Sequence, residues 1–167
     1  MTDKNVVIAV TDIRVLRKAL PNMVEWMNKL TGDVKATLLY VAEVSDMEAA
    51  TPVLEDMRIK EVQLRELAEE FAQHGIRAKF KLKAGSLSRE IVREARETGA
   101  FAILMSTDGR AGLSRMLTAS VIEEVIKRAP CPVVVFKPKL LRFTDKIALT
   151  LSSRIKKLSA SAALEQS

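Results

Sequence analysis

The chain has 167 residues, 48% of them hydrophobic, which is enough to bury the core of one domain without metals or disulfides. A single cysteine excludes a disulfide framework, and no stretch reaches the roughly 18 consecutive apolar residues of a membrane span. The net charge of +6 lies mainly in the last 31 residues: residues 1–136 hold 20 Lys/Arg and 19 Asp/Glu, whereas residues 137–167 hold 7 Lys/Arg and 2 Asp/Glu. The folded part therefore has almost no excess of positive charge and is not expected to bind nucleic acid.

The first half of the chain alternates apolar runs with amphipathic stretches. The run 6–10 predicts a strand buried on both faces. Apolar residues at three- and four-residue spacing over 13–30 predict a helix that Pro21 kinks or splits. A second apolar run, 36–41, predicts the next strand, and a long helix is expected over 52–74.

Residues 76–84 differ, because apolar and basic residues alternate there without a break. Period-two alternation indicates one wet face and therefore predicts an edge strand. The basic side chains of that face are Arg77, Lys79, Lys81 and Lys83. We interpret this face as solvated; the alternative is a basic stripe that docks a partner.

The second half continues the alternation. Helices are predicted over 86–99 and over about 120–128, the latter opened by the Ser-x-x-Glu spacing of a capping box. Strands are predicted over 101–105 and 133–136. Strands that alternate with amphipathic helices predict a doubly wound α/β fold with a parallel sheet and helices on both faces.

The tail, residues 139–167, is treated as a basic extension of a domain that covers residues 1–138. Apolar residues recur every three or four positions from Phe143 to Leu158, which predicts a basic amphipathic helix, and the end is expected to be disordered. We expect the helix to dock on the domain or its dimer mate; the alternative is a contact with an anionic membrane surface or an acidic partner.

Common catalytic and phosphate-binding motifs do not occur, and no nucleophile, base and orienting group stand at recognisable spacing. The sequence therefore makes no positive case for an enzyme. In doubly wound sheets, ligands bind beyond the carboxyl ends of strands where the strand order reverses. Thr11-Asp12 and Met105-Ser106 lie there if the first and fourth strands are neighbours.

The loop STDGRAGLSRMLTAS, residues 106–120, and the segment behind it resemble the universal stress protein family. The resemblance rests on GR-x-GLSR-x-L-x-x-SV, V-x-x-x-APCPVVVF and the initial VVIAVTD, and covers about residues 5–137. It implies a five-stranded, adenine nucleotide alpha hydrolase-like fold with strand order 3-2-1-4-5, and a cytoplasmic stress-response protein that forms a homodimer through Val133–Phe136. The N-terminus also lacks an export signal, so we expect a cytoplasmic location.

Family members that bind ATP have Gly-x-x-Gly, nine residues, then Gly-Ser or Gly-Thr. On this chain the three glycine positions fall on Ser106, Gly109 and Ala119, with Ser120 retained. If a replaced position needs a left-handed backbone, its Cβ costs ~1–2 kcal/mol, which weakens a site without forbidding it. The positive end of the helix that begins near Ser120 remains an anion site whatever residue precedes it.

The resemblance assigns candidate nucleotide contacts that also have plain structural roles. Asp12 lies beside adenine and ribose or caps the first helix, Val41 is an adenine wall or a core residue, and Ser120 is a phosphate ligand or an N-cap. Arg110 and Arg115 steer phosphate or are solvated. The candidate nucleotide-binding residues are Val10, Thr11, Asp12, Val41, Met105, Ser106, Gly109, Arg110, Ala119, Ser120 and Val121.

Three functions follow from these observations. The first is a dimeric, non-catalytic stress-response protein that binds ATP or AMP weakly or conditionally. The second is a protein-interaction member of the family that binds no nucleotide. The third is an enzyme acting on ATP, for which Asp12 and Asp108 could jointly hold magnesium.

Overall fold

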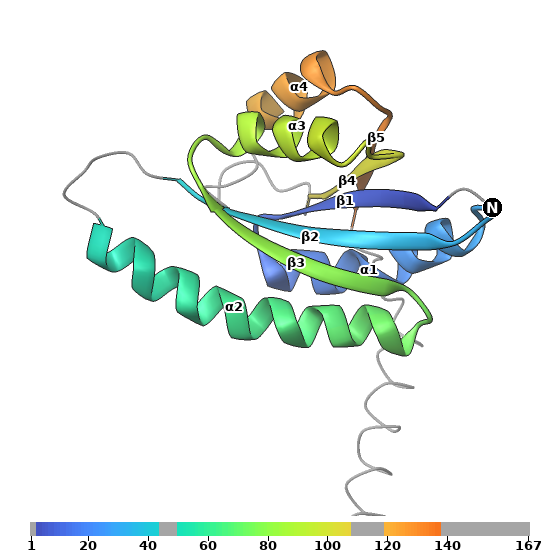
Figure 1. Ribbon diagram of the computed structural model, residues 1–167, viewed down its shortest axis with the longest axis horizontal. Helices are drawn as coiled ribbons and strands as arrows, with labels where there is room; N and C mark the ends of the chain where they lie inside the picture. Colours follow the sequence, from blue (N-terminus) through green and yellow to red (C-terminus); the bar gives the residue numbers. More distant parts are fainter. Residues whose placement is uncertain (1–2, 44–49, 108–118, 138–167) are drawn as a thin grey trace, which may run out of the picture.

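The computed structural model describes residues 3–43, 50–107 and 119–137 (Figure 1). In chain order the elements are β1 Lys4–Val10, α1 Ile13–Asn28, β2 Val34–Ala42, α2 Ala50–Gln73, β3 Arg77–Ala84, α3 Leu87–Glu97, β4 Ala102–Ser106, α4 Ala119–Arg128 and β5 Val133–Phe136. The predicted sequence of strands and helices is confirmed. Residues 138–167, which include the whole tail, lie outside the described residues, so the helix of the tail and the domain boundary stay predictions.

The five strands form one parallel sheet in the order β3-β2-β1-β4-β5. Helices α1 and α2 cover one face and α3 and α4 cover the other (Figure 1). This confirms the predicted fold class, the strand order and the edge position of β3. The chain winds outward from β1 in both directions, so the strand order reverses between β1 and β4.

Each face of the sheet has its own apolar core, because successive strand residues point to opposite faces. Ile8 and Leu38 pack with Met23 of α1 on one face, whereas Val7 and Leu39 pack with Ile91 of α3 on the other. All of these side chains are fully buried. The continuous apolar runs of β1, β2 and β4 are therefore explained by helices on both sides.

Helix α1 continues through Pro21, which the sequence suggested would kink or split it. Pro21 is exposed, and its ring removes one backbone donor on the solvent side of the helix. The opposite side carries Leu16, Met23 and Met27, which are fully buried. Burial of such side chains contributes about 1.5–3 kcal/mol each and outweighs the cost of an internal proline.

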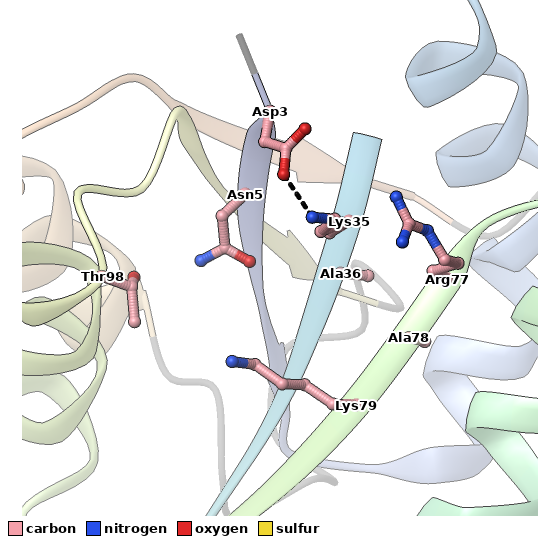
Figure 2. A pocket seen from close by; sticks show the side chains of 8 residues that line it. All are labelled: Asp3, Asn5, Lys35, Ala36, Arg77, Ala78, Lys79 and Thr98. Carbon is pink, nitrogen blue, oxygen red and sulfur yellow. Dashed lines mark hydrogen bonds and ion pairs between the residues drawn. The ribbon is translucent and has the colours of Figure 1, made fainter. Parts of the chain in front are cut away.

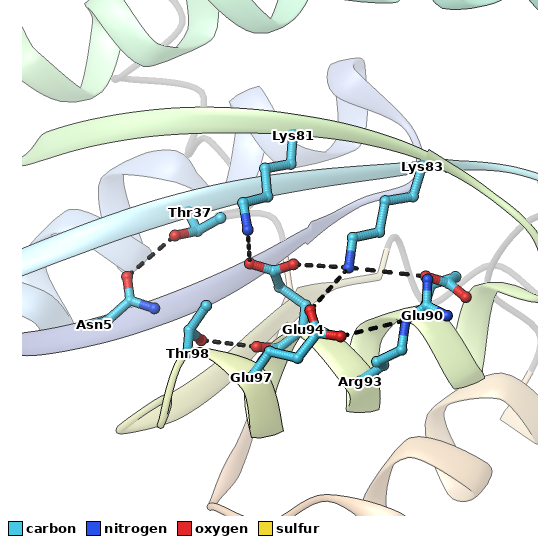
Figure 3. Close-up of polar contacts among 9 residues, drawn as sticks. All are labelled: Asn5, Thr37, Lys81, Lys83, Glu90, Arg93, Glu94, Glu97 and Thr98. Atoms are coloured by element: carbon cyan, nitrogen blue, oxygen red, sulfur yellow. Dashed lines mark hydrogen bonds and ion pairs between the residues drawn. The ribbon is translucent and has the colours of Figure 1, made fainter.

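The basic face of β3 is not simply solvated, which corrects the interpretation from the sequence. Lys81 Nζ lies 2.8 Å from Glu94 Oε1, and Lys83 Nζ lies 2.9 Å from Glu94 Oε2 (Figure 3). The side chain of Glu94, on α3, is inaccessible to solvent. Half of the predicted stripe thus binds the edge strand to the helix above it.

In the described part of the chain, no helix has the length and apolar character needed to cross a membrane.

Candidate functional site

The carboxyl ends of β1 and β4 lie side by side and form the edge of the sheet at which we expect a ligand from the sequence. The two strands pair in parallel, with Ile8 opposite Leu104. Extended by two residues, this register brings Val10 level with Ser106. Thr11-Asp12 and Met105-Ser106, which stand far apart in the sequence, therefore meet at the predicted switch point. We call these residues, with Val10 and Val41, the β1–β4 rim.

Asp12 is the N-cap of α1, so its structural alternative is confirmed. Its Oδ1 accepts hydrogen bonds from the backbone N–H of Arg14 at 2.8 Å and of Val15 at 3.4 Å, and its Oδ2 lies 3.1 Å from Arg14 Nη2. Burial raises the pKa of Asp12, but the hydrogen bonds from Arg14 and Val15 outweigh burial and lower it. The carboxylate is therefore charged at neutral pH.

Ser106 occupies the first glycine position of the ATP-binding pattern. It is 1% exposed, and its Oγ has no hydrogen-bond partner among the described residues. Non-glycine residues with positive φ are absent from the described residues, so Ser106 carries no left-handed strain. The effect of this serine on a ligand is therefore steric and polar.

Other predicted contacts at the rim are part of the two cores. Val10 is buried toward α1, whereas Val41 and Met105 are buried toward α3. Thr11 is also buried, with 8% of its surface exposed. These residues are therefore mostly buried, and three of the four are apolar.

Helix α4 supplies the remaining described candidates. Ala119 is its first residue, Ser120 is exposed, and Val121 packs against the core that contains Val41 and Met105. The first turn of α4 therefore lies on the α3 side of the sheet. Gly109 and Arg110 lie outside the described residues, as do Arg115 and Asp108.

A magnesium site is not tested by this part of the chain. The described residues contain no group of three or more His, Cys, Asp or Glu side chains placed to hold a metal ion. The pairing of Asp12 with Asp108 involves a residue outside them.

Two polar features elsewhere on the α3 face were not identified from the sequence. One is the ion-pair cluster around Glu94, which includes Glu90, Arg93 and Glu97 (Figure 3). A usable signal was present, since Glu90 and Glu94 are spaced four residues apart and flank the buried Ile91. The other is a pocket at the amino ends of β1, β2 and β3.

The sheet order, the reversal between β1 and β4 and the rim define a doubly wound α/β protein of the adenine nucleotide alpha hydrolase-like class. The model of the universal stress protein family matches residues 4–137. The chain therefore belongs to the universal stress protein family.

Known proteins agree with this assignment. Universal stress protein MJ0531 of Methanocaldococcus jannaschii is 35% identical over 118 residues, which cover 64% of this chain and 68% of that protein. The solved universal stress protein of Archaeoglobus fulgidus in complex with dAMP has a TM-score of 0.59 and 21% identity, covering 82% of this chain and all of that one. The solved structure of a universal stress protein in complex with cAMP has a TM-score of 0.58 and 18% identity, and the match covers 81% of this chain and 98% of the chain of that protein.

Proposed function

We propose that the protein is a non-catalytic stress-response protein that binds an adenine nucleotide, ATP or AMP, weakly or conditionally at the β1–β4 rim. The observation that carries this proposal is the meeting of Thr11-Asp12 with Met105-Ser106 at the reversal of strand order. Structural neighbours in complex with dAMP and cAMP support an adenine nucleotide as the ligand class.

The proposed weakness follows from Ser106 and Ala119, which stand where ATP-binding members have glycine. Ser106 places a Cβ and a buried hydroxyl at the end of β4, where a glycine would let a phosphate approach the backbone. Ala119, the first residue of α4, has a methyl group at the third glycine position of the pattern. The N–H groups and dipole of α4 still favour an anion.

Calorimetric titration of the full chain with ATP, ADP and AMP, each with and without magnesium, tests the proposal. Saturable heat with at least one nucleotide supports it. Absence of heat with all three favours the alternative, a protein-interaction member of the family, for which the lost glycines are the evidence. Release of phosphate from ATP above a protein-free blank would instead support an enzyme.

We also propose that two copies pair through β5. This strand lies at the edge of the sheet, and the side chain of Val135 is 38% exposed although it is apolar. In the described part of the chain no strand pairs with the outer edge of β5, and an apolar edge strand favours pairing with a second copy. Light scattering should give the mass of a dimer, and Val135→Glu should lower that mass to one chain; Val62→Glu on exposed α2 is the control.

The proposed location is the cytoplasm, in keeping with one cysteine that has no partner in the chain. The basic tail is proposed to contact the domain, its dimer mate or an anionic surface. Comparison of the full chain with a chain ending at residue 138, by light scattering and by binding to anionic vesicles, distinguishes these partners.

A further inference from the structure

A pocket lies at the opposite end of the sheet from the β1–β4 rim. Its volume is about 530 Å³, and it is lined by the first residues of β1, β2 and β3 and by Thr98 at the end of α3 (Figure 2). Sites for small molecules have volumes of about 300–1,000 Å³. The pocket is thus large enough for a ligand of several non-hydrogen atoms.

The strand register gathers polar side chains of three strands in this pocket. Asn5 pairs with Lys35 and Lys35 pairs with Arg77, so the three form a row across β1, β2 and β3. In the next row Thr37 pairs with Lys79. A nonlocal register therefore brings four hydrogen-bond donors, from Asn5, Lys35, Arg77 and Lys79, to one end of the sheet.

Asn5 is oriented by a buried neighbour. Thr37 Oγ1, which is fully buried, donates a hydrogen bond to Asn5 Oδ1 at 3.1 Å. The acceptor side of the amide is therefore used, and the Nδ2 donors point the other way, toward the side on which Thr98 lies (Figure 2). This leaves the Nδ2 group to donate to a ligand in the pocket.

The charges of the α3 face are balanced at one end and unbalanced at the other. Lys81, Lys83 and Arg93 are matched by Glu90, Glu94 and Glu97, so the cluster around Glu94 carries no net charge.

Around the pocket, Lys35 pairs with Asp3 and Arg77 pairs with Asp33, but Lys79 has no carboxylate partner among the described residues. Figure 2 shows the Lys79 side chain crossing β2 toward Asn5 and Thr98. The pocket therefore has one surplus positive charge.

We propose that this pocket binds a small ligand through an oxyanion group, a carboxylate or a phosphate. Lys79 Nζ supplies the countercharge, and Asn5 Nδ2 and Lys35 Nζ supply further donors. Hydrogen bonds between charged groups are shorter and stronger than neutral ones. The Asp3–Lys35 pair is exposed and contributes little by itself, so Lys35 can turn toward the ligand at small cost.

The test is a site-resolved NMR titration of the full chain with inorganic phosphate and, separately, with malonate, at constant ionic strength. We expect saturable shifts of the backbone amides of Asn5, Lys35, Lys79 and Thr98. Saturation by phosphate alone identifies a phosphate-bearing ligand, and saturation by malonate alone identifies a carboxylate. Saturation by both phosphate and malonate supports an oxyanion site that does not distinguish phosphate from carboxylate.

Three variants make the test specific. Lys79→Met should weaken the binding at least fivefold, and Asn5→Asp, which keeps the acceptor for Thr37 but adds a carboxylate, should abolish it. Lys18→Met, an exposed lysine of α1, removes the same charge and should leave the binding unchanged. Unchanged thermal midpoints verify that the variants fold.

The proposal is overturned if the pocket amides do not shift saturably with either probe. It is also overturned if Lys18→Met weakens binding as much as Lys79→Met, because the effect would then be one of overall charge. Shifts confined to Ser106 and Ser120 would place the only anion site at the β1–β4 rim and would contradict the proposal as well.

Discussion

Replacing Glu94 with glutamine removes the buried charge that joins β3 to α3. The change keeps the size of the side chain, but it leaves Lys81 and Lys83 without their shared carboxylate at 2.8 and 2.9 Å. Glu94 is inaccessible to solvent, while the side chains of Lys81 and Lys83 are 39% and 18% exposed. The perturbation is therefore the loss of one fully buried partner from a cluster whose cations are partly hydrated.

The size of the effect follows from that difference in exposure. Removing one partner of a fully buried ion pair costs about 3–5 kcal/mol. Here the lysines keep part of their hydration, and Lys83 still has Glu97 at 3.5 Å and Glu90 at 3.9 Å. We therefore expect Glu94→Gln to lower the free energy of unfolding by about 2 kcal/mol at neutral pH, below the fully buried range.

Acid should reduce this difference. Burial raises the pKa of Glu94, but Lys81 and Lys83 outweigh burial and lower it below its ordinary value of 4.5. A carboxyl group with a lowered pKa stabilises the fold above its ordinary pKa, and this stabilisation is lost as the pH falls below 4.5 through the lowered value. The wild-type protein should therefore lose more stability in acid than Glu94→Gln.

Urea unfolding at pH 7 and at several values below 4.5 measures both effects. Glu97→Gln is the matched control, because it removes the same charge from the same helix at a side chain that is 55% exposed. We expect the control to cost well under 1 kcal/mol. Equal losses for the two variants, or a Glu94→Gln loss that does not shrink in acid, would show that the buried charge of Glu94 does not stabilise the fold.

Three further predictions concern single side chains. Ser106→Ala should stabilise the fold by about 1 kcal/mol in urea unfolding, because it removes a buried hydroxyl that has no partner among the described residues. Ser88→Ala should destabilise the fold by a similar amount, because the Ser88 hydroxyl lies 2.8 Å from Glu124. Changes of the same sign in the two variants would contradict this prediction. Asp12→Ala removes the N-cap of α1 and should lower the free energy of unfolding by about 1 kcal/mol. Because the pKa of Asp12 is lowered from 3.8, this loss should shrink as the pH falls below 3.8. A loss that does not depend on pH would exclude the capping carboxylate as its cause. Burial and the 2.5 Å hydrogen bond to Asp56 raise the pKa of Tyr40, which is the only tyrosine in the sequence. The absorbance of Tyr40 should therefore not change near pH 10 until the protein unfolds. Ionisation of Tyr40 at pH 10 in the folded protein would show that its contact with Asp56 does not form in solution.

The sequence predicted the elements whose pattern is local. Uninterrupted apolar runs identified β1, β2 and β4, because strands covered on both faces have no polar side. Alternation identified β3 as an edge strand. Even so, β1 and β2 begin two residues earlier than their apolar runs, at Lys4 and Val34, because strand pairing includes polar residues, such as Lys4 and Lys35, that interrupt the apolar pattern.

The polar contacts between elements were not predictable in the same way. Lys81 and Lys83 look like solvent-facing residues until α3 is placed over them, and that placement depends on how the helix packs on the sheet. The pocket around Lys79 has the same origin, because Asn5, Lys35 and Lys79 come together only through strand pairing. At the β1–β4 rim, by contrast, the switch-point rule was sufficient to bring Thr11 and Ser106 together.

The most direct test of nucleotide binding at the β1–β4 rim is the affinity of the double variant Ser106→Gly, Ala119→Gly for AMP and ATP, measured by calorimetry beside the wild type. His74→Gly, which introduces a glycine in the exposed turn before β3, at the end of the sheet opposite the rim, is the control. The double variant should bind about tenfold more tightly, which corresponds to about 1.4 kcal/mol, and the control should not change. Unchanged affinity in the double variant would show that Ser106 and Ala119 do not limit nucleotide binding, and no binding by either protein would show that the rim is not a nucleotide site.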